Sequence, residues 1–115
     1  MKRDEMNVRA SELTKLSAAV EAYIRYGNPP PGASEEDVLR EATRDQPRLL
    51  EDFAAFKLRV LSQDRHGAVL VCTKAGDRAL LEDAGCTGKM DVHHWEKKDA
   101  PCSFTVSIPR ICTSR

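Results

Sequence analysis

The apolar residues near the start of the chain recur at helical spacing. Between residues 11 and 26 they fall every three or four positions, at Leu13, Leu16, Val20 and Ile24. Ser11 can cap the first turn because its hydroxyl can accept a hydrogen bond from an unpaired amide. Gly27 can end the helix in the left-handed conformation. The pattern predicts a helix over residues 11–26, preceded by a flexible polar N-terminus at residues 1–10.

Two further helices are predicted beyond a proline-rich connector. Residues 28–32 read Asn-Pro-Pro-Pro-Gly, which cannot continue a helix and is typical of an extended spacer. Ser34 can then cap a second helix, with Asp37 placed to return the bond in a capping box. Its apolar stripe is Val38, Leu39 and Ala42. Pro47 opens a third helical stretch over residues 47–56, with an apolar face of Leu49, Leu50, Phe53 and Phe56.

The hydrophobic period changes to two after this stretch. Apolar residues alternate with basic ones from Phe56 to Val60, and residues 68–73 form a second β-rich run. Turn residues occupy positions 63–67 between the two runs. This arrangement predicts a β-hairpin.

A fourth helix and a last strand complete the prediction. Thr73 can cap a helix over residues 74–84, and Gly85 can end it. Residues 103–108 alternate polar and apolar before Pro109, as in a final or edge strand. The predicted order is three helices, a β-hairpin, a fourth helix and a C-terminal strand, in a single α+β domain over residues 11–115.

Composition excludes some classes of partner. The 18 basic and 18 acidic residues give a formal net charge of zero, so no overall charge attracts the chain to nucleic acid or anionic lipid. No segment approaches the roughly 18 apolar residues needed to span a bilayer, and we expect no membrane partner. The first residues carry no apolar run typical of a signal peptide, which favours a cytoplasmic location.

The four cysteines bear on that location. All lie in the second half of the chain, at Cys72, Cys86, Cys102 and Cys112. For a cytoplasmic protein we expect free, mostly buried thiols. In an oxidising compartment an even count would suit disulfides, and a bridge between Cys86 and Cys102 would close the loop around Trp95.

One passage resembles a known family. The stretch Val71-Cys72-Thr73-Lys74-Ala75-Gly76-Asp77-Arg78-Ala79-Leu80-Leu81-Glu82 is similar to the "L-T-x-x-G-x-x-L-L-E" passage that follows the wing in bacterial regulators of the MarR and PadR kinds. The resemblance implies a winged helix-turn-helix fold, with Arg65 and His66 at the wing tip and residues 47–56 as the DNA-recognition helix. That helix, however, carries Glu51 and Asp52, whose carboxylates would repel phosphates. DNA binding is therefore the disfavoured alternative.

Candidate chemistry is sparse. His93 and His94 lie near several cysteines, and thiolate with imidazole would suit zinc, but no Cys-x-x-Cys pair exists and adjacent histidines on a strand point to opposite faces. We expect neither metal nor cofactor. No nucleophile elbow or glycine-rich phosphate loop occurs, and the adjacent carboxylates at 51–52 and 82–83 are expected on solvated helix surfaces. The sequence does not indicate an enzyme.

These absences favour a non-catalytic protein-binding module, such as an adaptor, an inhibitor or an accessory regulatory protein. The alternative is a winged-helix DNA-binding transcriptional regulator. Exposed tryptophan and arginine often anchor interfaces, so the predicted binding surface comprises the hairpin tip and the loop around the tryptophan. Its residues are Arg65, His66, His93, His94, Trp95, Lys97 and Lys98.

Overall fold

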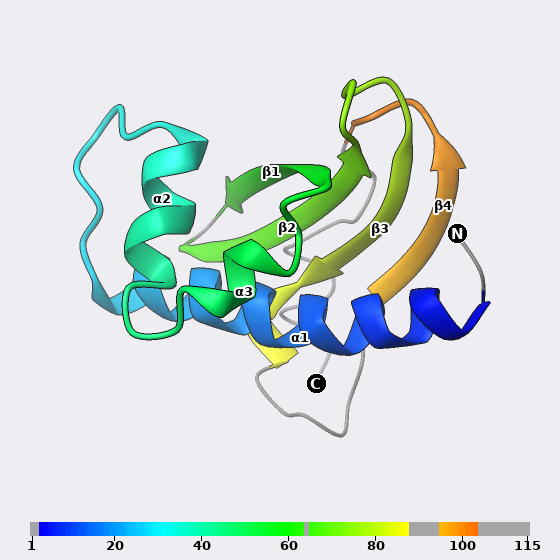
Figure 1. Ribbon diagram of the computed structural model, residues 1–115. Coiled ribbons are helices and arrows are strands. Elements are labelled where there is room, and N and C mark those ends of the chain that lie inside the picture. The colour runs from blue at the N-terminus through cyan, green and yellow to red at the C-terminus, as the bar shows by residue number, and fades with distance from the viewer. Residues whose placement is uncertain (1–2, 64, 88–94, 104–115) are drawn as a thin grey trace.

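The computed structural model describes residues 3–63, 65–87 and 95–103 of the chain (Figure 1). Three helices precede four strands, and a short 3-10 helix follows the third strand. In chain order the elements are α1 (Arg3–Tyr26), α2 (Glu35–Ala42), α3 (Arg48–Glu51), β1 (Phe56–Gln63), β2 (His66–Thr73), β3 (Ala79–Ala84), η1 (Gly85–Thr87) and β4 (Trp95–Ala100).

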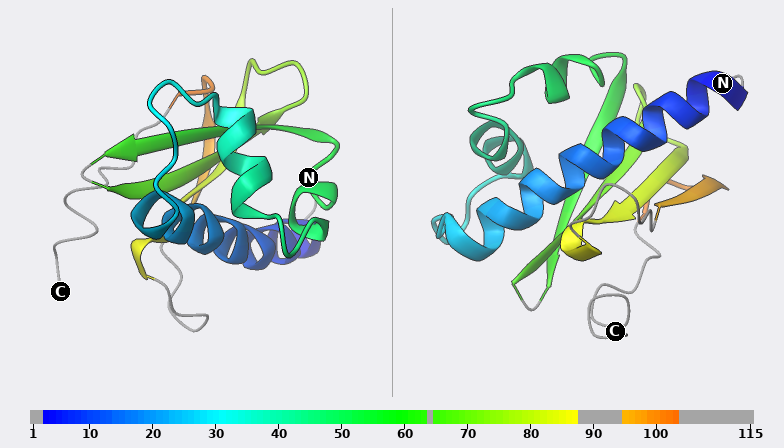
Figure 2. Two further views of the ribbon diagram at one scale, coloured as in Figure 1. Left: turned by 90° about the vertical axis from the view of Figure 1, so that its left-hand side faces the viewer. Right: turned by 90° about the horizontal axis from the view of Figure 1, so that it is seen from below.

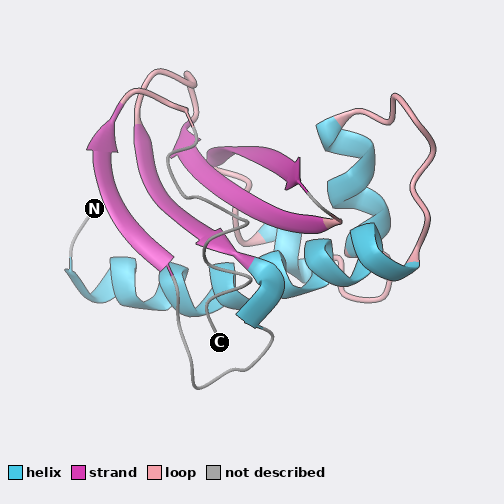
Figure 3. Ribbon diagram, turned by 180° about the vertical axis from the view of Figure 1, so that it is seen from behind, coloured by secondary structure: helices cyan, strands magenta, loops and turns pink. Residues whose placement is uncertain are grey.

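The four strands form one antiparallel sheet in the order β1-β2-β3-β4, so each strand pairs with the next and β1 and β4 are the edges (Figure 3). The longest pairing joins β1 to β2, from Phe56 opposite Thr73 to Gln63 opposite His66. Helix α1 crosses one face of this sheet, while α2 and α3 lie on the same side near β1 (Figure 2). The sheet edge at β1 therefore lies beside two short helices.

The main core lies between α1 and the sheet. Leu13, Leu16 and Val20 are fully buried on the inner stripe of α1, as their spacing predicts. Burying each such side chain stabilises a fold by about 1.5–3 kcal/mol. They pack with apolar residues from α2, from α3 and the turn after it, and from β2 and β3: Val38, Leu39, Leu49, Phe53, Val69, Val71 and Leu81.

The three predicted N-terminal helices are present, but only some of their predicted ends agree with the structure. Helix α1 ends at Tyr26, directly before Gly27, although it begins at Arg3 rather than at Ser11. The left-handed conformation expected at Gly27 is found instead at Asn28, whose φ is +50°. Helix α2 has Ser34 at its N-cap, with the Ser34 hydroxyl accepting a hydrogen bond of 3.0 Å from the Asp37 amide. The third helix is shorter than predicted, since it ends at Glu51 and the chain turns before β1 begins.

The predicted β-hairpin is confirmed as β1 and β2, but the predicted helix over residues 74–84 is wrong. Thr73, the expected helix cap, closes a turn instead: its hydroxyl donates to Asp77 at 2.6 Å and its carbonyl accepts from Gly76 at 2.8 Å. Gly76 has a φ of +77°, which a glycine adopts without strain. The turn sends the chain back along β2 as β3, so both sides of β2 are hydrogen-bonded.

The winged-helix-like order is therefore wrong. In the described part of the chain a third strand follows the hairpin, where that order requires a helix. Trp95, expected in a loop, begins strand β4. Ser103 lies at a bend, and the rest of the strand predicted over residues 103–108 is outside the described residues.

Candidate functional site

The two predicted residues at the hairpin tip are tied to helix α1. Arg65 lies in the β1–β2 turn with a φ of +64°, and its guanidinium donates to the Arg25 carbonyl at 2.6 Å. His66 is only 19% exposed, and its Nδ1 lies 2.6 Å from Glu21 Oε2. Arg65 is exposed and His66 is partly exposed, and each is hydrogen-bonded to α1.

Glu21 and His66 form a carboxylate–imidazole pair, the arrangement that serves as the base in many hydrolases. The other Glu21 oxygen accepts the Gly67 amide at 2.6 Å, and the Arg25 guanidinium lies 3.2 Å from the ring nitrogens of His66. The geometry fits the tautomer that donates from Nδ1 to Glu21. Within the described residues no hydroxyl or thiol hydrogen-bonds to this ring. The cluster joins the hairpin to α1.

Three of the predicted residues lie in β4: Trp95, Lys97 and Lys98. Lys98 has a side chain only 6% exposed; its Nζ lies 3.4 Å from Glu82 Oε2 and donates to the Ser103 carbonyl at 2.9 Å. The backbones of Trp95 and Lys97 pair with Asp83 and Leu81 in the sheet. His93 and His94 lie outside the described residues.

Asp83 is the other buried carboxylate of β3, and it faces α1. The Ser17 hydroxyl donates to Asp83 Oδ2 at 2.5 Å, while Oδ1 has no hydrogen-bond partner among the described residues. Burial raises the pKa of Asp83 to about 6, although the Ser17 hydroxyl and the Ala84 amide act in the opposite direction. The expectation that Glu82 and Asp83 are solvated on a helix surface is wrong, because Glu82 is 0% and Asp83 1% exposed.

The sequence feature that could have indicated the buried carboxylates is a row of polar residues on the inner face of α1. Thr14, Ser17 and Glu21 recur at helical spacing within the apolar stripe, and all three are buried. Buried polar groups need hydrogen-bond partners, so such positions indicate polar residues across the interface.

The cysteines differ from the expected free thiols. Cys72 of β2 is bonded to Cys102 beyond β4, with their Cα atoms 5.9 Å apart, and Cys86 is disulfide-bonded as well. The bridge predicted between Cys86 and Cys102 is therefore wrong, because Cys102 pairs with Cys72. Cys72 and Cys102 pack with Leu70 and Ala79 in a small apolar cluster. Because side chains alternate along a strand, this cluster lies on the face opposite Val69 and Val71.

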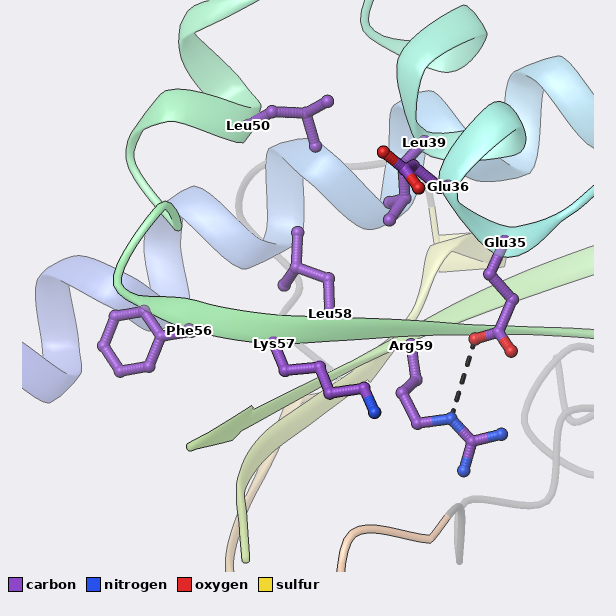
Figure 4. A pocket seen from close by; sticks show the side chains of 8 residues that line it. All are labelled: Glu35, Glu36, Leu39, Leu50, Phe56, Lys57, Leu58 and Arg59. Atoms are coloured by element: carbon purple, nitrogen blue, oxygen red, sulfur yellow. Dashed lines mark ion pairs between the residues drawn. The ribbon is translucent and has the colours of Figure 1, made fainter. Parts of the chain in front are cut away.

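A surface groove of about 580 Å³ lies between the short helices and β1 (Figure 4). Apolar side chains and charged side chains of both signs line it. The apolar residues are Leu39, Leu50, Phe56 and Leu58, and the charged residues are Glu35, Glu36, Lys57 and Arg59. In Figure 4, Leu58 points toward the helices, whereas Lys57 and Arg59 extend from the other side of β1. The groove therefore follows the edge of the sheet.

Glu35 links the groove to that edge. Its Oε1 accepts the Val60 amide at 2.7 Å and lies 3.6 Å from the Arg59 Nε, so one carboxylate covers one backbone donor of β1. Lys57 is exposed and lies close to Gly76 in the β2–β3 turn. No carboxylate in the described part of the chain forms an ion pair with Lys57.

The groove was not predicted, because it forms only when α2, α3 and β1 come together. Two sequence features were related to it: the basic residues at positions 57 and 59, which alternate with apolar residues, and the acidic first turn of α2. Each was assigned a local role only.

The described residues contain no group of three or more histidine, cysteine or acidic side chains placed to hold a metal ion. None of the helices described is both long and apolar enough to cross a membrane. Comparison with protein-family models, with curated proteins and with solved structures finds no match for the chain.

Proposed function

We propose that this chain is a non-catalytic protein-binding module and that the groove beside β1 receives its partner. The observation that carries the proposal is the position of the groove, which is lined by apolar and charged side chains and lies along an edge strand of an antiparallel sheet. Protein interfaces combine apolar and polar contacts, and sheet edges are recurrent sites of peptide recognition.

The buried ionisable groups support a non-catalytic role. Asp83 lies beneath α1, Glu82 pairs with Lys98, and Glu21 holds His66 and the hairpin. Each of these groups is bonded to the scaffold, and none of them lines the groove. The groove itself offers carboxylates, an ammonium and a guanidinium, which suit recognition of a charged surface.

We further propose that the protein works in an oxidising compartment. The disulfide between Cys72 and Cys102 supports this location over the cytoplasmic one expected from the sequence, because structural disulfides persist mainly where thiols are not kept reduced. A DNA-binding role is not proposed, since the winged-helix order that implied it is wrong.

The test is site-specific photo-crosslinking in the cells that produce the protein. A photoreactive residue replaces Glu36, which is exposed on α2 and lines the groove. A matched variant carries the same residue at Lys15, which is exposed on α1 and does not line the groove. A discrete protein adduct at position 36 but not at position 15 is expected. Equal adducts at both positions, or none at position 36, would reject the proposal.

A further inference from the structure

Among the residues that the structure describes, no strand pairs with the outer edge of β1 beside the groove. The Val60 amide donates to Glu35, so it points away from β2. In an antiparallel strand every second residue points its amide and carbonyl to the same side, and Leu58 therefore also presents both groups outward. No hydrogen bond joins these Leu58 groups to any residue that the structure describes. An edge with an unpaired donor and acceptor can accept another strand.

The two faces of that edge differ in chemistry. Toward the helices, Leu58 faces Leu39 and Leu50 across the groove (Figure 4). On the opposite face of β1, Lys57 and Arg59 extend along the strand. Because side chains of a paired strand alternate in register with those of β1, a strand added here places every second residue beside the leucines. The intervening residues lie beside the two basic groups.

Glu35 already makes contacts of the kind that an added strand would make. Its carboxylate accepts the Val60 amide, as a strand carbonyl would, and it lies beside Arg59, as an acidic side chain would. The Glu35 side chain is 44% exposed, so it can leave this position without breaking the core.

We infer that the groove binds an extended peptide segment of a partner protein as a fifth strand on β1, with apolar residues alternating with acidic ones. This inference rests on the proposed protein-binding function and specifies its ligand. The apolar residues occupy the space beneath α2 and α3, and the acidic residues pair with Lys57 and Arg59. Glu35 swings away as the peptide binds, which frees the Val60 amide.

The experiment measures peptide binding by fluorescence anisotropy with the oxidised, full-length chain. The probe is a synthetic peptide of about eight residues, an ordinary strand length, that alternates valine and glutamate. A peptide alternating valine and lysine is the matched probe of opposite charge. The acidic peptide is expected to bind at least about tenfold more tightly, since opposite charges across two strands contribute roughly 0.2–1 kcal/mol per pair and like charges oppose pairing.

Variants locate the binding to the edge. Lys57→Glu is expected to weaken binding of the acidic peptide about fivefold or more, whereas Lys15→Glu, the same change on an exposed position of α1, leaves it unchanged. Glu35→Ala is expected to strengthen it, because the covered amide becomes free. Hydrogen exchange at the Leu58 amide should slow at least about tenfold when the peptide binds.

Several outcomes would overturn the inference. Equal affinity for the two peptides, equal effects of Lys57→Glu and Lys15→Glu, or unchanged exchange at Leu58 would each do so. If Glu35→Ala makes the protein dimerise without binding peptide, the occupant is a second copy, and the inference is also wrong. A partner adduct at position 36 together with failed peptide binding rejects only strand addition. Absence of that adduct rejects the protein-binding function itself.

Discussion

Replacing Asp83 with asparagine tests whether burial under α1 raises the pKa of this carboxylate. Burial raises the pKa of this group from 3.8 to about 6, so the folded protein holds its proton over a pH range where the unfolded chain has lost it. Stability contributed by Asp83 is therefore greatest below the unfolded value and decreases as pH rises toward 6. A shift of this size corresponds to about 3 kcal/mol.

Asparagine carries no charge at any of these pH values. Its amide oxygen can still accept the Ser17 hydroxyl, while its NH₂ group occupies the place of the unpartnered Oδ1. An unsatisfied buried amide costs about 1–3 kcal/mol, but this cost does not vary with pH. The difference in unfolding free energy between Asp83→Asn and the natural protein should therefore rise by about 2.5 kcal/mol from about pH 4 to about pH 7.5.

Urea denaturation of both proteins across this pH range measures the difference directly. Taking the difference cancels the titration of groups that the two proteins share. Ser17→Ala supplies the matched variant: loss of the hydroxyl removes an interaction that lowers the pKa of Asp83, so the decline in stability should extend to a higher pH than in the natural protein. A difference curve that is flat, or that falls with rising pH, would refute the assignment of Asp83 as a desolvated carboxylate.

Two further predictions concern the scaffold. Removing the bridge with Cys72→Ala and Cys102→Ala should lower the unfolding free energy by about 3.5 kcal/mol in urea denaturation, as loop closure over a separation of 30 residues implies; an unchanged midpoint would contradict a structural disulfide. Gly85→Ala should destabilise by more than about 1–3 kcal/mol, because a Cβ there would overlap the Ser17 carbonyl oxygen of α1. Equal thermal midpoints for Gly85→Ala and the natural protein would show that the helix and η1 separate freely.

Local chemistry explains which parts of the fold the sequence predicted. Ser34 caps α2 by accepting a hydrogen bond from the Asp37 amide. The hairpin prediction also rested on neighbouring residues, since the period of two and the turn between the strands lie within one short segment. In each case the deciding contacts join residues close together in the chain.

The strand after β2 could not be predicted from neighbouring residues. Residues 79–84, Ala-Leu-Leu-Glu-Asp-Ala, favour a helix by composition, yet they form β3. The strand conformation of these residues is set by their pairing with β2, which is a tertiary contact and overrides local propensity. The same error hid the buried carboxylates, because a surface helix would have left Glu82 and Asp83 in water.

Glu35 illustrates why the candidate site was not predicted from the sequence. An acidic residue in the first turn of a helix is sufficiently explained by the helix dipole, so its presence in α2 required no partner. The structure gives the same carboxylate a second role across the groove, on the Val60 amide of β1. A side chain that both starts a helix and covers a sheet edge couples the two elements. Loss of Glu35 should therefore open the edge while leaving the Ser34 cap to hold the helix, which separates the binding role from the folding role.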